Sequence, residues 1–312
     1  MRPCVFIHTN HKQYVGALVS AYSFRRFAKD PDAFDVQIIH TKDFPFLREH
    51  EGEAYLRDGV KRHWRYDDLQ SFTTLRFMPP ERMGYEGRSV VVDPDVFAVG
   101  DVGELLARDM GGKAIIARTR PGPRTLTDGG RYNSSVMLLD NAKLRHWRVE
   151  EQFEAMFEMQ RDYRRWITLG YEDSATIGEL EREWNDLDHL DTRTRMIHNT
   201  HRKTQPWKSG LPVDFIPAER FRPFPPIAWA LRLRRKLFGD YGLLGTYKPH
   251  PDRNQEKLFF GLLKECLANG LVTEELVREE MRQNHVRKDA LDVIAAAPPL
   301  SSLPLSALPR AA

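Results

Sequence analysis

The chain has 312 residues, of which 41% are hydrophobic and 11% aromatic, enough for the core of one large or two modest domains. Basic residues number 47 against 44 acidic ones, a balance that argues against a nucleic-acid-binding protein. Cys4 and Cys266 are the only cysteines, which excludes a disulfide framework or a four-thiolate zinc site. With no secretory signal and no run near the ~18 apolar residues of a membrane span, we expect a soluble, cytoplasmic protein.

Strand and helix patterns alternate at the start of the chain. Residues 5–8 predict a buried strand, residues 14–27 a helix and residues 34–39 a second strand. This order is typical of a parallel strand–helix–strand unit, and therefore of an α/β fold. A polar helix is expected near residues 47–65.

The most hydrophobic strand candidate follows. Residues 89–92 contain three consecutive valines and predict a buried strand that runs into residues 93–95, Asp-Pro-Asp. The remaining expectations are a short helix at 102–108, strands at 114–117 and 136–139, a loop at 122–130, mostly helix at 143–166 and a strand end at 196–197.

The composition shifts near residue 217, so we divide the chain there. The boundaries that we predict are a larger domain over 1–216, a helical region over 217–294 and a disordered tail over 295–312. Within the helical region, one helix is expected at about 255–269, and a second begins after Thr273 as N-cap.

Residues 226–238 combine Trp, Leu and Arg in a helical pattern. On a helical wheel the apolar side chains spread over one side and three basic ones gather opposite, although Arg234 interrupts the apolar face. One interpretation is a helix packed against the larger domain with its arginines reaching outward. The alternative is peripheral contact with the inner face of an anionic membrane.

Asp93 and Asp95 form the most informative pair. Side chains at i and i+2 of an extended chain point to the same side, so these carboxylates converge where a buried strand ends. Ligands of open α/β sheets bind at such carboxyl ends, and two converging carboxylates favour a hard cation such as Mg²⁺ or Mn²⁺. The alternative is an ordinary acidic turn.

Polar residues near two later strands can complete such a site. His198 follows the strand end at 196–197 and can act as a third ligand, with His201 as a fallback. Lys203 and Lys208 can take diphosphate charge, or belong to a basic surface loop. Asn133 and Ser134 precede the strand at 136–139 and can face a pocket, or serve only a turn.

In chain order, five segments within residues 3–210 resemble glycosyltransferase family 8, the family of glycogenin and of bacterial lipopolysaccharide galactosyl- and glucosyltransferases. The family's first strand, nucleotide loop and helix are matched by HTNHKQYVGALVSAYSF, and its Arg-bearing helix, strand and D-x-D by TLRFMPPERMGYEGRSVVVDPDVFAVGDVGELL. Its Asn-Ser-Gly strand, its Asp-Gln helix with a downstream Trp/Tyr-Asn and its His…Lys-Pro-Trp loop resemble RYNSSVMLLDNAKLRHW, YEDSATIGEL with REWN, and RMIHNTHRKTQPWKSG. The shared order is more specific than any single motif.

The resemblance implies a GT-A-type fold and roles for individual residues. Asp93, Asp95 and His198 would hold Mn²⁺ or Mg²⁺, and Asp93 would also contact the ribose side of the donor. Asp173 would lie near the reacting carbon as nucleophile or stabiliser. The other implied residues of the donor site are Thr9, Asn10, Arg76, Asn133, Ser134, Lys203 and Lys208, of which Arg76 and Asn133 would also serve catalysis.

Three residues depart from the family pattern. Ser135 stands where the family has Gly, Ser174 where it has Gln, and Gln205 where it has the Lys before Pro-Trp. His198 also lies one residue further from Pro206 than usual. These departures concern the donor sugar and the extent of activity.

The function that the resemblance implies is a metal-dependent, retaining glycosyltransferase. It would move a sugar, most simply from a UDP-hexose, to an acceptor such as a cell-surface saccharide, with no nucleic-acid partner. Two alternatives stay open: a non-catalytic nucleotide-sugar or saccharide binding protein, and a sugar-phosphate nucleotidyltransferase. The latter class usually has a Gly-rich loop after its first strand, where this chain has HTNHKQYVG.

Overall fold

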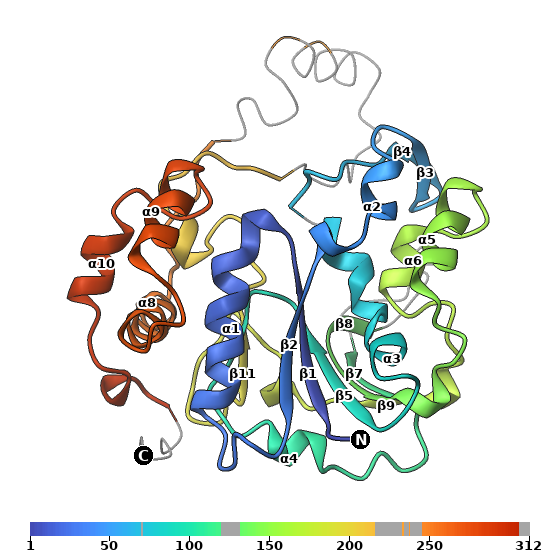
Figure 1. The fold of residues 1–312 in the computed structure, drawn as a ribbon, viewed down its shortest axis with the longest axis horizontal. Helices are drawn as coiled ribbons and strands as arrows, with labels where there is room; N and C mark the ends of the chain where they lie inside the picture. The colour runs from blue at the N-terminus through green and yellow to red at the C-terminus, as the bar shows by residue number, and fades with distance from the viewer. Residues whose placement is uncertain (70, 120–131, 216–232, 234–236, 238–244, 306–312) are drawn as a thin grey trace.

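A six-stranded sheet in the order β2-β1-β5-β8-β7-β9 forms the centre of the computed structural model, which describes all residues except 70, 120–131, 216–232, 234–236, 238–244 and 306–312 (Figure 1). Its strands are β1 (Cys4–Thr9), β2 (Asp35–His40), β5 (Arg88–Val92), β7 (Ile115–Thr119), β8 (Tyr132–Asp140) and β9 (Ile177–Glu179). Only β8 runs antiparallel to its neighbours, β5 and β7. The expected α/β fold with a mixed, mainly parallel sheet is therefore confirmed.

The central strands are buried on both faces, which explains their uninterrupted hydrophobic runs. Because successive side chains point to opposite faces, Val90 and Val92 pack on the side of α1 (Tyr14–Arg26), whereas Val91 packs with Phe77 on the other side. That other side is covered by α3 (Pro79–Arg82), α5 (Val149–Phe157) and α6 (Tyr163–Ile167) (Figure 1). Burial of each such side chain contributes about 1.5–3 kcal/mol.

The helix expected near residues 47–65 is wrong. Only α2 (Phe46–Glu49) is helical, and β3 (Ala54–Arg57) and β4 (Val60–His63) form an antiparallel hairpin. The connecting residues Asp58 and Gly59 have φ values of 55° and 69°, as a two-residue hairpin turn requires. The Gly59 amide donates to Asp162 Oδ2 at 2.8 Å, which attaches the hairpin to the N-terminus of α6.

A second, three-stranded sheet lies beside the first in the order β10-β11-β6. Its strands are β6 (Val96–Ala98), β10 (Asp186–Leu187) and β11 (Met196–His198), with β11 antiparallel to β6. Helix α1 supports β6, because Ser20 Oγ donates to the Val96 carbonyl at 2.6 Å and the Ala98 amide donates to Ser23 Oγ at 2.9 Å. The short helix α4 (Gly103–Leu106) follows β6, close to its expected position.

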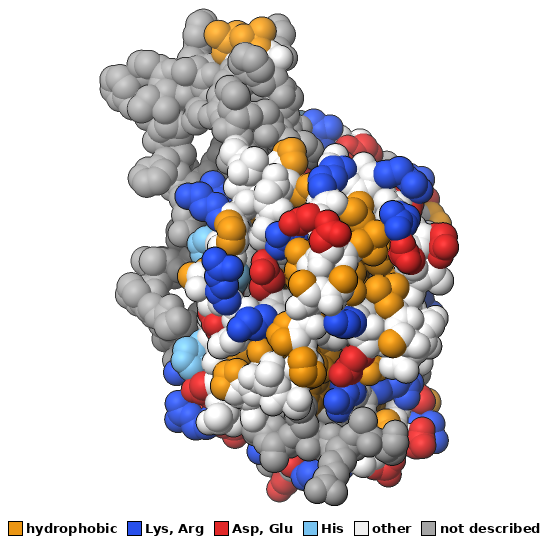
Figure 2. Space-filling view, turned by 90° about the vertical axis from the view of Figure 1, so that its left-hand side faces the viewer, with side chains coloured by type: hydrophobic (Ala, Val, Ile, Leu, Met, Phe, Trp, Pro, Cys, Tyr) orange, Lys and Arg blue, Asp and Glu red, His pale blue; other side chains and the backbone are white. Residues whose placement is uncertain are grey.

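Of the C-terminal helices, α8 (Arg253–Ala268) packs against the outer side of α1, whereas α10 (Ala290–Ala296) packs against α8 and α9 (Glu274–Arg282) (Figure 1). Thr273 caps α9, as expected, by accepting a hydrogen bond from the Leu276 amide at 3.2 Å. Over these helices the surface mixes basic and acidic side chains with hydrophobic ones between them (Figure 2). The predicted helical C-terminal region is confirmed.

Of the tail that we expected to be disordered over 295–312, the structure describes residues 295–305. Leu300 and Leu303 are buried in the core that α8 shares with α1, because Gly261 leaves room for the Leu300 side chain. The predicted boundary near 217, the loop at 122–130 and nearly all of 226–238 lie outside the described residues. Within the described part of the chain, no helix combines the length and the apolar character that crossing a membrane requires.

Candidate functional site

Two short strands bring the predicted metal ligands together. Asp93 follows β5, and the turn over residues 93–96 is closed by a hydrogen bond from the Val96 amide to the Asp93 carbonyl at 3.1 Å. In the ladder of β6 and β11, His198 lies directly opposite Val96. His198 therefore faces Asp93 and Asp95, although it lies 103 residues after Asp95 in the chain.

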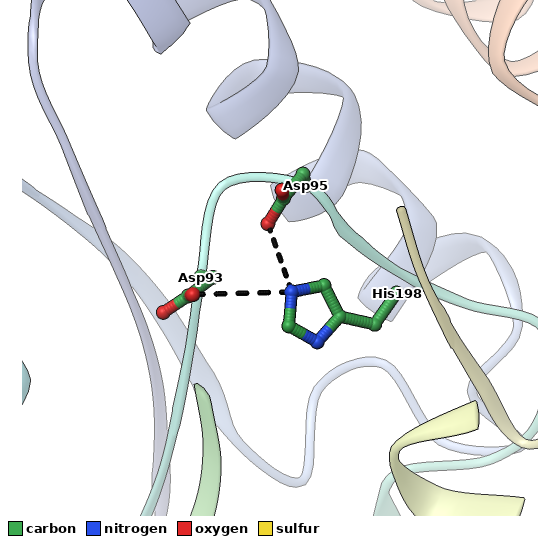
Figure 3. A group of neighbouring side chains, drawn as sticks. All are labelled: Asp93, Asp95 and His198. Carbon is green, nitrogen blue, oxygen red and sulfur yellow. Dashed lines mark ion pairs between the residues drawn. The ribbon is translucent and has the colours of Figure 1, made fainter. Parts of the chain in front are cut away.

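The three side chains point toward one another at the end of the central sheet (Figure 3). His198 Nε2 lies 3.3 Å from Asp95 Oδ1 and 3.9 Å from Asp93 Oδ2. One ligand atom from each of these residues lies within 4.8 Å of the others. All three residues are largely buried, so the repulsion between the two carboxylates and the attraction of each for the imidazole are only weakly screened by solvent.

Asp93 is held by two further residues. Arg76 donates from Nε to Oδ1 at 2.8 Å and from Nη2 to Oδ2 at 2.5 Å, and His8 Nε2 lies 2.8 Å from Oδ1. Burial alone would raise the pKa of Asp93, but the Arg76 guanidinium and His8 hold it well below its ordinary value. Asp93 is therefore a carboxylate at neutral pH.

The far side of the His198 ring is also fixed. Its Nδ1 lies 2.9 Å from Asn185 Oδ1, and Asn185 Nδ2 donates to Ser135 Oγ at 3.1 Å. Since the Asn185 carbonyl oxygen can only accept, His198 Nδ1 carries a proton and Nε2 faces the two carboxylates. Burial opposes a charged imidazole, yet Asp95 and Asp93 raise the pKa of His198.

The residues present fit a divalent cation. Asp95 Oδ1 is buried and accepts no hydrogen bond within the described chain. Two carboxylates and an imidazole nitrogen held from behind by a hydrogen bond are a common donor set for such ions. His201 is exposed, and its Nδ1 contacts Thr204 Oγ1 at 3.1 Å, so the structure brings His198 rather than the fallback histidine to the aspartates.

A cavity of about 360 Å³ opens beside the three residues. Asn133 and Arg118 contribute to its wall where the ladder between β7 and β8 shifts its register after Ala117, a β-bulge that redirects side chains. Ser135, which departs from the family pattern, lines it as well. Its size lies in the range of small-molecule sites.

Gln205, at the position where the family has a lysine, contacts one of the candidate metal ligands. Its Nε2 donates to Asp95 Oδ2 at 3.2 Å, and its Oε1 accepts from Gln13 Nε2 at 3.2 Å. Both glutamines line the cavity. Gln205 thus positions one of the candidate metal ligands.

Several predicted residues lie away from the described cavity wall. Asp173 is exposed and caps a short 3-10 helix, accepting from the Ala175 amide at 2.9 Å. Lys203 is exposed, and Lys208 is buried in an ion pair with Asp214 at 2.5 Å, where burial lowers the pKa of the lysine. The remaining three hydrogen-bond within the protein: Thr9 to the Asn10 carbonyl, Asn10 to the segment at 68–71, and Ser134 to Arg76 and the Ile167 carbonyl.

Other residues of the site did not emerge from the sequence. His8 is the next-to-last residue of β1, whose parallel register with β5 pairs Ile7 with Val92 and so places His8 beside Asp93. The predicted parallel unit paired the strand at 5–8 only with that at 34–39, so it did not indicate this neighbour of Asp93. Asn185 lies in the REWN motif, which suggested the residue without its role. Three cavity arginines, Arg57, Arg164 and Arg202, had no such indication.

Comparison with solved structures returns proteins described as glycosyltransferases. GlyE of Streptococcus pneumoniae aligns with a TM-score of 0.46 and 13% identity over 86% of this chain and 64% of its own. The galactosyltransferase LgtC, solved with donor and acceptor sugar analogs, aligns with a TM-score of 0.44 and 13% identity over 65% of this chain and 89% of its own. The bifunctional enzyme WbbM gives 0.47 and 13% over 66% of this chain and 46% of its own.

With TM-scores below 0.5, these similarities do not identify the function of this chain. The chain spans about two thirds of GlyE and less than half of WbbM. No family model and no curated protein matches its sequence.

Proposed function

We propose that this protein is a metal-dependent glycosyltransferase of the GT-A type that uses a nucleotide sugar. The observation that carries the proposal is the convergence of Asp93, Asp95 and His198 beside a polar cavity. Two carboxylates and an imidazole suit Mn²⁺, and carboxylates alone would suit Mg²⁺ as well. A UDP-hexose is the donor that the sequence resemblance favours.

The proposed cation would neutralise charge on the departing diphosphate. Arg76 is fixed by Asp93 and Ser134, so its contribution is to hold the Asp93 carboxylate in one orientation. Asn133 and Ser135 lie in β8, the strand that pairs with β5, and provide polar groups for hydroxyls of the donor sugar. These residues position the donor without a change in their own protonation.

The proposed reaction retains the configuration of the donor sugar. The acceptor oxygen forms a bond to the anomeric carbon, the bond from that carbon to the phosphate oxygen breaks, and the acceptor proton passes to the departing phosphate. Among the described lining residues the carboxylates are Asp93 and Asp95. Asp93 is paired with Arg76, and Asp95 contacts His198 and Gln205. This favours attack on the leaving-group face over a glycosyl–carboxylate intermediate on Asp173.

Thermal denaturation with UDP, GDP and ADP, each with and without Mn²⁺, tests the proposal. A ligand at 100 times its Kd adds about 2.7 kcal/mol of stability, which gives a clear shift in Tm. We expect a Mn²⁺-dependent shift with UDP in the wild type, and none in Asp95→Asn. Slow hydrolysis of one UDP-sugar under the same conditions would support transfer chemistry.

A nucleotide sugar that binds without any turnover would instead support a binding protein. The specific observation that favours this second function is the exposed position of Asp173, outside the described cavity wall. Absence of a shift with every nucleotide would contradict both proposals and leave residues 93–95 as an acidic turn.

A further inference from the structure

Three arginines from separate elements reach the wall of the cavity. Arg57 ends β3, Arg164 lies in α6, and Arg202 lies in the loop after β11. The hairpin and α6 lie on the side of the central sheet away from α1 (Figure 1). The three arginines line the same cavity as the three candidate metal ligands.

Two of these arginines are held by aromatic rings. The guanidinium carbon of Arg57 lies 4.8 Å from the centre of the Tyr163 ring, and that of Arg202 lies 5.5 Å from the centre of the Phe215 ring. Stacking of this kind fixes the plane of a guanidinium and leaves its N–H donors directed past the ring. The two groups are thus oriented before any ligand binds.

The arginines have little negative charge close by. Within the described chain, the nearest carboxylate contact is Asp58 Oδ1, 4.0 Å from Arg164 Nε, and neither Arg57 nor Arg202 has a carboxylate within 4.0 Å. Asp68 acts on both at longer range. Burial, together with the like charges of Arg57 and Arg164, lowers the pKa of Arg202, whereas Tyr163, Tyr55 and Asp68 raise the pKa of Arg57 against its burial.

The charge of the whole cavity leads to the same point. Five arginines and two aspartates are among its described lining residues, so three positive charges have no opposite charge in the wall. A divalent cation and the diphosphate of a nucleotide sugar carry equal and opposite charges. Binding of the nucleotide sugar with its cation therefore leaves the three positive charges of the cavity wall unbalanced. Asp58, which contacts Arg164, offsets only part of this positive charge.

We propose that Arg57, Arg164 and Arg202 bind an anionic group, a carboxylate or a phosphate, on the acceptor sugar. Guanidiniums donate to planar carboxylates and to phosphates with two parallel hydrogen bonds, which matches either group. The inference rests on the proposed function, because it assigns the substrate class of the same cavity. The acceptor is then an acidic saccharide rather than a neutral one.

Calorimetry on the full chain saturated with Mn²⁺ and UDP tests this assignment. The probes are two matched pairs: methyl β-glucuronide with methyl β-glucoside, and glucose 6-phosphate with glucose. We expect at least one charged sugar to bind 10-fold or more tightly than its neutral partner, and the pair that responds separates carboxylate from phosphate. Arg57→Gln and Arg202→Gln should each remove most of that preference.

Three controls make the outcome specific. Arg202→Lys keeps the charge and should retain part of the preference, and Arg165→Gln, at an exposed arginine of α6 outside the described cavity wall, should leave it unchanged. Circular dichroism checks that each variant is folded. Equal binding of charged and neutral sugars by a wild type that binds UDP would overturn this inference alone, whereas a wild type that does not bind UDP would overturn the proposed function. Loss of UDP binding in the Gln variants would assign the arginines to the donor site and would also overturn the inference that they bind the acceptor.

Discussion

Arg76 binds both carboxylate oxygens of Asp93, and Arg76 Nη1 also donates to Ser134 Oγ at 2.9 Å. This pair lies directly behind the candidate metal ligands, with both side chains about nine-tenths buried. A buried ion pair of this kind is costly to break from one side only.

Removal of the arginine should therefore destabilise the protein. In Arg76→Met the Asp93 carboxylate keeps only His8 and the more distant His198, and we expect the free energy of unfolding to fall by about 3 kcal/mol. Denaturant unfolding measures the change. The double variant Arg76→Met/Asp93→Asn should recover part of the loss, and additive effects of the two substitutions would contradict the coupling.

Asn185 should affect metal binding without touching the cation. It holds the Nδ1 side of His198, and loss of such a contact typically reduces metal affinity 10–100-fold. We expect Asn185→Leu to weaken Mn²⁺ binding by that factor, measured by electron paramagnetic resonance of the free ion. Asn185→Asp, which still accepts from Nδ1, should keep most of the affinity, and equal losses in both variants would argue against this role.

A substitution at Gly16 tests whether helix propensity or the close contact of α1 with the turn over residues 93–96 determines stability. A Cβ at this position of α1 would lie 2.9 Å from the Pro94 carbonyl oxygen, closer than such atoms approach. Propensity alone predicts that Gly16→Ala stabilises the helix by about 1 kcal/mol. We expect the opposite sign, together with weaker Mn²⁺ binding, because the turn over residues 93–96 must move. A more stable variant with full Mn²⁺ affinity would show that the turn tolerates the displacement.

His40 should make the protein sensitive to acid. Burial lowers the pKa of His40 to about 4, whereas a histidine in the unfolded chain titrates near 6.5. Because the unfolded state takes up the proton first, stability is lost as the pH falls from 6.5 toward 4. His40→Asn can still accept from the Lys42 amide and should lose up to about 3 kcal/mol less over this range. Urea unfolding at pH 7 and pH 4.5 compares the two, and identical pH profiles would exclude His40 as the source.

The sequence predicted the parts of the fold that depend on local pattern. The buried strands and α1 were found because hydrophobic runs and helical spacing report burial directly. The hairpin over residues 54–63 was missed, although Asp58-Gly59 is a strong turn pair, because a polar, half-exposed segment carries weak periodicity.

The site was predictable where one strand sets it, and less so where distant segments meet. Asp93 and Asp95 follow from the end of β5, and His198 from the end of β11. The positions of Asp173 and Lys208 depend on how later loops pack, which no spacing reveals. Lys208 illustrates this, since a lysine in a basic loop forms a buried pair with Asp214.

The pairing of β6 with β11 places the candidate site at the contact between two segments that lie far apart in the chain. This ladder has only three residue pairs, and the side chain of its last residue, His198, faces the aspartates. A cation that bridges these residues would have to be released before the ladder could open. Slower hydrogen exchange at the amides of Val96 and Val99, which donate to the Asp93 and Arg195 carbonyls, would then report occupancy from the backbone alone.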